Sequence, residues 1–142
     1  MKNFKCLLAV IVAAIVANVL DFLVQGMLLT NTFYSKIEGA KQDTAPKWFI
    51  FGDVAAVFVL ACVIKRTEAA FGYGAKGGAT AGFYLGVLAS FPAYHFVYLT
   101  TKGYPYSLAW INTFYYIGWY VLIGAIIGAL RTKPAPAAAP AH

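Results

Sequence analysis

The sequence predicts an all-α integral membrane protein that folds as a bundle of four transmembrane helices. Hydrophobic residues make up 61% of its 142 residues and charged residues only 11%, whereas soluble domains carry about 25% charged residues. The apolar residues gather into four runs, and each run meets or approaches the roughly 20 residues that cross a bilayer as a helix. None of the runs carries the charged face that a helix of a soluble bundle needs.

We expect the four spans at about residues 6–30, 47–66, 78–100 and 107–130. Together they form one transmembrane domain over residues 1–133. Residues 134–142 are rich in Ala and Pro and have little apolar surface to bury, so we expect a disordered tail there.

The positions of the basic residues predict the topology. Four spans place both termini on one side of the membrane. If that side is the cytoplasm, seven basic residues lie inside (Lys2, Lys5, Lys65, Arg66, Lys76, Arg131 and Lys133) and four lie outside (Lys36, Lys41, Lys47 and Lys102). The positive-inside rule therefore favours cytoplasmic termini, N-in and C-in. The net charge of +6 then serves topology and contact with lipid headgroups, not nucleic acid.

The first span carries a polar stripe. Asn18, Asp21 and Gln25 are spaced three and four residues apart, so a helix places them on one face. A carboxylate that faces lipid costs at least about 2.5–3.5 kcal/mol, so this face should point into the protein or toward water. For Asn18 we favour a structural role, whereas for Asp21 a structural and a functional role stay open.

The third span combines small residues with a histidine. Gly78, Gly82, Gly86 and Ser90 recur at four-residue steps, which is the pattern that lets two membrane helices approach closely. Pro92 should kink this helix, because it cannot donate to the carbonyl four residues earlier. An ionisable side chain, His95, follows three residues later.

The fourth span has two different halves. Aromatic residues crowd its outer half, around Asn112, and its inner half carries Gly124 and Gly128 as a second close-packing motif. The second span contributes one acidic residue, Asp53, soon after its start.

Depth along the helices suggests a shared site. At roughly 1.5 Å per residue, polar groups from all four spans fall in the outer half of the membrane, namely Asp21, Gln25, Asp53, His95 and Asn112. One interpretation is a polar pocket that handles protons, cations or a small polar ligand. Another is a set of hydrogen bonds that only sets helix register. A third is ligation of haem or a pigment metal by His95, the only metal-ligand candidate.

The chain also contains a faint internal repeat. Each half runs from an apolar helix through Leu-Thr, a loop with Tyr-Ser and a second apolar helix to Arg-Thr. The two halves would form a parallel repeat of helical hairpins about an axis along the membrane normal. In this alignment Gln25 and His95 occupy matching positions.

Several short motifs point to a known kind of protein: Asp21-Phe22, Gln25-Gly26, Leu28-Leu29, Gly52-Asp53 and the Gly/Pro pattern of residues 78–100. In these the chain resembles uncharacterised small four-helix inner-membrane proteins of bacteria. The resemblance implies the topology and brings no activity.

We therefore expect a non-enzymatic membrane protein, in contact with the lipid bilayer, that acts as a structural or accessory subunit. It would pack through its glycine-rich helix faces with itself or with a larger membrane complex, and no cofactor is predicted for this role. The alternative is a small transporter or channel that uses the polar pocket.

Overall fold

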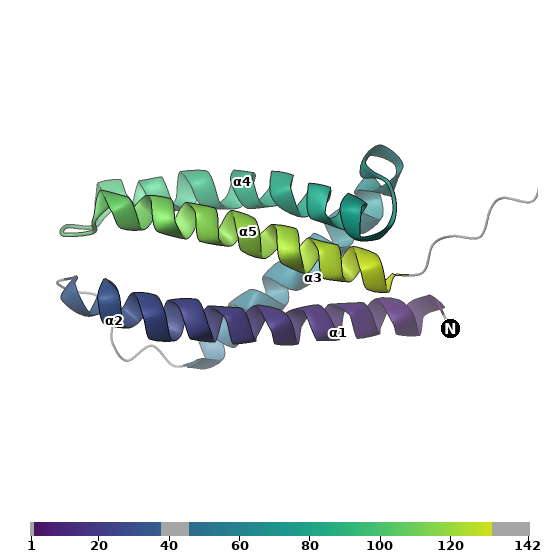
Figure 1. Ribbon diagram of the computed structural model, residues 1–142, viewed down its shortest axis with the longest axis horizontal. Helices are drawn as coiled ribbons and strands as arrows, with labels where there is room; N and C mark the ends of the chain where they lie inside the picture. The colour runs from purple at the N-terminus through teal and green to yellow at the C-terminus, as the bar shows by residue number, and fades with distance from the viewer. Residues whose placement is uncertain (1, 38–45, 132–142) are drawn as a thin grey trace, which may run out of the picture.

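The computed structural model describes residues 2–37 and 46–131, and this part of the chain is helical with no strands. Figure 1 shows how these helices are arranged in space. In chain order the elements are α1 (Lys2–Asp21), η1 (Phe22–Leu29), α2 (Thr30–Thr32), η2 (Tyr34–Lys36), α3 (Pro46–Phe71), α4 (Gly74–Thr100) and α5 (Tyr106–Leu130).

Three helical segments are long and apolar enough to cross a membrane: Phe4–Lys36, Lys47–Phe71 and Tyr106–Leu130. The helix α4, which we also expected to span, is as long as the others but less apolar, because glycine, tyrosine, Pro92 and His95 dilute its run. The predicted all-α class is confirmed. The tail at 134–142 and most of the loop before α3 lie outside the described residues.

Helices α4 and α5 form a close antiparallel pair, whereas α1 and α3 do not pack against each other in this way. Helices α4 and α5 run antiparallel and side by side, and α1 lies along α5, whereas α3 crosses behind them on a diagonal (Figure 1). We call the end with η2 and the turn at residues 101–105 the loop end, and the end with Lys2 and Leu130 the terminal end. The two halves of the chain therefore pack differently, and the predicted parallel repeat is not visible in the helix packing.

The first helical segment changes from an α-helix to a π-helix directly after Asp21. After Asp21 the chain continues as a π-helix, η1, in which the Thr30 N–H donates to the Gln25 carbonyl five residues earlier. The Thr30 hydroxyl donates to the same carbonyl at 2.7 Å. We expected an uninterrupted α-helix here. π-helical turns are rare in proteins, and those that occur often lie at functional sites.

Glycines hold α4 against α5. A Cβ built on Gly78 would lie 2.0 Å from the Gly124 carbonyl oxygen, and on Gly82 and Gly86 it would approach the α5 backbone to 2.1 and 3.0 Å. A Cβ on Gly128 would lie 2.3 Å from the α4 backbone. These glycines thus lie at a close helix contact, as their spacing predicts. The contact is internal, however, so these faces are occupied within the chain.

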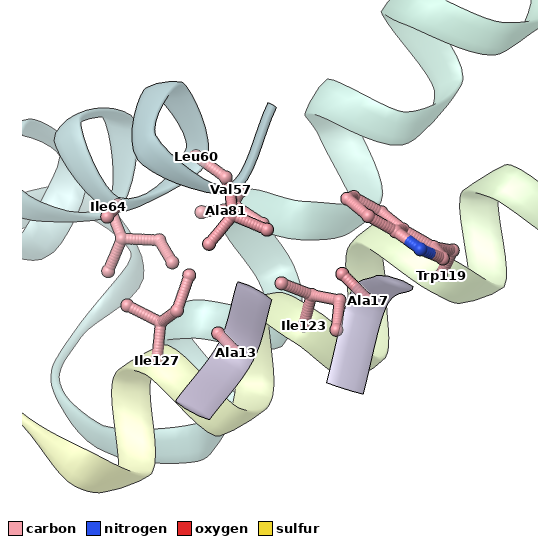
Figure 2. Packing of buried hydrophobic residues seen from close by; sticks show 10 residues of the cluster. Ala13, Ala17, Val57, Leu60, Ile64, Ala81, Trp119, Ile123 and Ile127 are labelled. Carbon is pink, nitrogen blue, oxygen red and sulfur yellow. The ribbon is translucent and has the colours of Figure 1, made fainter. Parts of the chain in front are cut away.

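An apolar core joins all four long helices at mid-length (Figure 2). From α1 it receives a stripe of alanines at four-residue steps, Ala9, Ala13 and Ala17, and the next residue of this stripe is Asp21. The other helices supply larger side chains, namely Val57, Leu60 and Ile64 from α3 and Trp119, Ile123 and Ile127 from α5. The small alanines let α1 approach the groove between α3 and α5.

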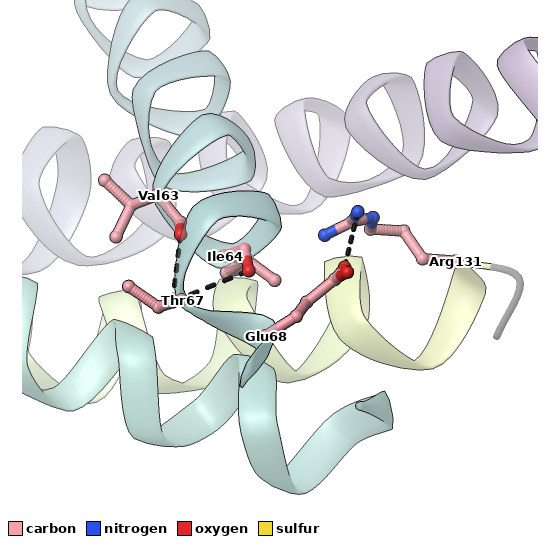
Figure 3. Close-up of polar contacts among 5 residues, drawn as sticks. All are labelled: Val63, Ile64, Thr67, Glu68 and Arg131. Atoms are coloured by element: carbon pink, nitrogen blue, oxygen red, sulfur yellow. Dashed lines mark hydrogen bonds and ion pairs between the residues drawn. The ribbon is translucent and has the colours of Figure 1, made fainter. Parts of the chain in front are cut away.

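The terminal end is closed by an ion pair between the ends of α3 and α5. Arg131 Nη2 binds Glu68 Oε1, and Thr67 donates to the Val63 carbonyl at 2.9 Å within α3 (Figure 3). Both charged side chains are largely buried, so the pair connects the two helix ends where the apolar core stops.

Candidate functional site

A buried carboxylate lies between α1 and α5. Asp21 is 7% exposed, and both of its oxygens accept hydrogen bonds from tyrosines of α5. Tyr115 donates to Oδ1 at 2.6 Å and Tyr116 donates to Oδ2 at 3.1 Å. Two phenol donors compensate a carboxylate for the water that it loses on burial.

A second carboxyl group approaches Asp21 from α3. Asp53 is 9% exposed, and its side chain is close enough to Asp21 for the two carboxyl groups to interact electrostatically. Asp53 Oδ2 is buried and receives no hydrogen bond from the described residues. In this pair both oxygens of Asp21 have donors, whereas Oδ2 of Asp53 has none among the described residues.

A closed hydrogen-bond network lies one turn nearer to the loop end. Gln25 Nε2 donates to Asn112 Oδ1 at 2.8 Å, Asn112 Nδ2 donates to the Tyr34 hydroxyl at 2.8 Å, and that hydroxyl donates to Gln25 Oε1 at 3.2 Å. Asn112 also donates to the Tyr104 hydroxyl at 2.8 Å. Since Asn112 has no exposed surface and all its polar hydrogens are used, this network joins η1, the η2 turn and α5.

The network reaches residues outside the long helices. Tyr104 belongs to the turn at residues 101–105, and burial raises the pKa of its hydroxyl, so it stays neutral. Tyr34 belongs to η2. Both tyrosines thus connect the loop end to the interior of the bundle.

We call the two groups together the polar band: Asp21, Gln25, Tyr34, Asp53, Tyr104, Asn112, Tyr115 and Tyr116. It brings together four of the five residues that the sequence suggested for a pocket. Sequence reasoning missed Tyr34, Tyr104, Tyr115 and Tyr116 as hydrogen-bond partners. The available signal was the need of buried amides and carboxylates for donors, which tyrosine meets within an apolar run.

His95 does not join the polar band, in contrast to our expectation. Its Nδ1 lies 2.8 Å from the Phe91 carbonyl, and its ring packs against Phe91 and Trp110 with centroid distances of 4.5 and 4.7 Å. The reason is helical phase. Ser90 continues the buried glycine edge of α4, and its four-residue step reaches Tyr94, which stacks on Tyr116. His95 is one residue further and is turned about 100° away.

Two other expected roles can be placed on the structure. Asn18 donates only to the Ala14 carbonyl of its own helix at 2.9 Å, as a structural residue would. Among the described residues no group of three or more His, Cys, Asp or Glu side chains could hold a metal ion. His95 Nε2 is buried without a hydrogen-bond partner there, and ligation of haem or a pigment through this atom stays a prediction.

The chain matches no family model, no curated protein and no solved structure. What the fold and the site define together is a helical protein with membrane-spanning capacity and a polar band inside its bundle. The chemistry open to this band is that of carboxyl groups and neutral hydrogen-bonding groups, which is the exchange of protons or the binding of a small cation.

Proposed function

We propose that this chain is a four-span protein of the bacterial inner membrane, with both termini in the cytoplasm, that carries protons or small cations through its polar band. The observation that carries the proposal is the buried pair of Asp21 and Asp53, which come from two different helices. Ionisable residues within membrane spans are costly, and they mark ion pathways and proton relays.

The packing of α4 supports a fourth span. Only a short turn separates α4 from α5, and the two helices touch along their length, from Gly74 near Gly128 to Tyr98 beside Tyr106. If α5 crosses the bilayer, α4 runs antiparallel through the same thickness. Its lower hydropathy is compensated because its glycine edge faces α5 and not lipid.

The glycine faces give less support to an accessory role. Gly78, Gly82 and Gly86 meet the α5 backbone, and Gly124 and Gly128 meet the α4 backbone. A partner subunit could reach these glycines only by separating the two helices. The polar band is therefore the better basis for a function.

Ion flux tests the proposal. Purified protein is reconstituted into liposomes with an internal pH-sensitive dye, and pH, Na⁺ or K⁺ gradients are imposed in turn. We expect the wild-type protein to dissipate at least one of these gradients faster than empty liposomes. Asp21→Asn and Asp53→Asn should each reduce the rate about tenfold or more, which corresponds to 1.4 kcal/mol or more of lost interaction.

Asn18→Leu is the matched control, because Asn18 lies one turn before Asp21 and bonds only its own helix. It should leave the flux unchanged. Equal rates for wild-type and empty liposomes under all three gradients would refute the proposed function. So would full activity in both aspartate variants.

A further inference from the structure

We propose that the aspartate pair holds one proton, located on Asp53, and that loss of this proton releases the loop-end segment of α3, residues Lys47–Ala55, from the bundle. This inference rests on the proposed function. It names the proton as the species exchanged and α3 as the element that moves. It follows from the burial pattern of α3 and from the hydrogen bonds of the pair.

Among the described residues, Asp53 is the one buried side chain in the loop-end segment of α3. From Lys47 to Ala55 every residue except Asp53 is exposed, including Trp48, Phe49 and Phe51. The buried stripe of the helix continues with Val57, Leu60 and Ile64 beyond this segment. From Val57 onward α3 is thus held by the apolar core, whereas within Lys47–Ala55 the buried contact comes from one titratable side chain.

The hydrogen bonds place the proton. Two carboxylates that lie close together in a buried site repel each other, so the pair is stabilised when one of them keeps a proton. Asp21 accepts from Tyr115 and Tyr116 and is stabilised as the anion. Asp53 receives no donor on Oδ2 and is therefore the group that carries the proton and donates it to Asp21.

Loss of the proton changes the interaction between Asp53 and Asp21 from attraction to repulsion. The O–H bond of Asp53 breaks, its electron pair stays on the carboxylate oxygen, and the proton leaves to water at the loop end. Two anions then face each other in an apolar environment, where like charges repel strongly. Because no other described residue between Lys47 and Ala55 is buried, this segment can relieve the repulsion by moving toward lipid and water.

Among the described residues, neither carboxyl group of the pair forms an ion pair with a basic side chain. From α1 the group that faces Asp53 is Asp21, and from α5 these are the neutral hydroxyls of Tyr115 and Tyr120. Among the described residues the ion pair that forms is that of Arg131 with Glu68, at the terminal end of the bundle. The state of α3 should thus follow the protonation of this carboxyl pair: docked at low pH and released as the pH rises.

Distance measurements between spin labels test the inference. Cys6 and Cys62 are replaced by Ala, and labels are attached at Phe51→Cys on α3 and Phe114→Cys on α5, which are both exposed. The protein is placed in lipid nanodiscs and measured by pulsed electron paramagnetic resonance between about pH 5 and about pH 9, since buried carboxyl groups titrate within this range. We expect a short, narrow distance distribution at low pH and a longer, broader one at high pH.

A second label pair serves as the control. Leu88→Cys on α4 and Phe114→Cys on α5 lie on the hairpin that the glycines hold together. Their distance should not change with pH. A change in this pair as large as that of the first pair would mean that the whole bundle opens, which contradicts the inference.

Two variants test the role of the proton. Asp53→Asn cannot ionise and still donates to Asp21, so the label distance should stay short at every pH. Asp21→Asn removes the repulsion and should also abolish the lengthening at high pH. A constant distance in the wild-type protein, or a pH-dependent distance that survives in Asp53→Asn, would overturn the inference. Flux without α3 movement would refute only this inference, whereas movement without flux would refute only the proposed transport.

Discussion

At the scale of residues, the buried polar groups of this protein differ in how complete their hydrogen bonds are. Asn112 uses its carbonyl oxygen and both of its N–H groups, so it has no capacity left for a ligand. Asp53 keeps one buried oxygen without a donor among the described residues. Within the polar band, residues whose hydrogen bonds are all made serve the structure. A residue with a buried polar atom that lacks a partner is a candidate for function.

The Asn112 network should contribute strongly to stability. Asn112→Leu keeps a similar volume but removes the acceptor of the Gln25 side-chain N–H and the donors to the Tyr34 and Tyr104 hydroxyls. The Tyr34 hydroxyl keeps its bond to Gln25 Oε1. Each buried group left unsatisfied costs about 1–3 kcal/mol. We expect a clear drop in the thermal unfolding temperature in detergent.

Thr113→Val is the matched control for this change. Thr113 is the next residue, is equally buried, and donates only to the Ala109 carbonyl of its own helix. Its replacement should cost little. If both variants unfold at the same temperature, the network does not stabilise the bundle.

At the scale of elements, the four long helices are held in different ways. The hairpin of α4 and α5 is held by backbone contact at its glycines, α1 packs through its alanine stripe, and the loop-end segment of α3, Lys47–Ala55, buries only Asp53 among its residues. The π-helix η1 adds a fourth feature, because it begins directly after Asp21 and contains Gln25. The widened turn thus coincides with the part of the first helix that supplies the polar band.

Gly82 offers a direct test of the hairpin. In Gly82→Ala the new Cβ would lie 2.1 Å from the Tyr120 carbonyl oxygen, so the two helices must separate. Overpacking of this kind typically costs about 1–3 kcal/mol, and more where backbone atoms clash. We expect a lower unfolding temperature in detergent.

Gly118→Ala is the control on the same helix pair, because nothing lies within 4 Å of a Cβ at this position. It should be neutral or stabilise the protein by up to about 1 kcal/mol, since Ala favours helix over Gly. Equal destabilisation by both substitutions would show that helix propensity, not the close contact, determines the effect.

At the scale of the whole molecule, charge and polarity divide the bundle along its length. The terminal end carries the ion pair of Glu68 and Arg131, the middle is an apolar core, and the polar band lies toward the loop end. Under the proposed orientation the terminal end faces the cytoplasm, where the basic residues Lys65, Arg66 and Lys76 would meet anionic headgroups.

Cysteine labelling tests this orientation. In a protein with Cys6 and Cys62 replaced by Ala, a reagent that cannot cross the membrane is added to intact cells. We expect it to label Lys102→Cys in the turn between α4 and α5 and not Lys76→Cys at the start of α4. Both positions should react after the membrane is permeabilised. Labelling of Lys76→Cys alone in intact cells would reverse the orientation.

What the sequence by itself determined is local. Long apolar runs predict helices because a backbone in an apolar medium must satisfy its own hydrogen bonds, and all four long helices lie where these runs lie. The four-residue glycine steps predict a close contact, because only residues without a Cβ allow backbones to touch. The cost of a lipid-facing carboxylate placed Asp21 in the interior.

What only the tertiary structure decided is which groups meet. The glycine edge could serve a partner chain or α5, and the fold assigns it to α5. A rotation of about 100° per residue separates Tyr94, beside Tyr116, from His95, among aromatic rings. Tyr34 and Tyr104 reach the network from turns, where no helical periodicity predicts which side chains point inward. Because α3 crosses the other helices on a diagonal, Asp53 is the one buried residue between Lys47 and Ala55. Burial there depends on the position of the neighbouring helices and not on the local sequence.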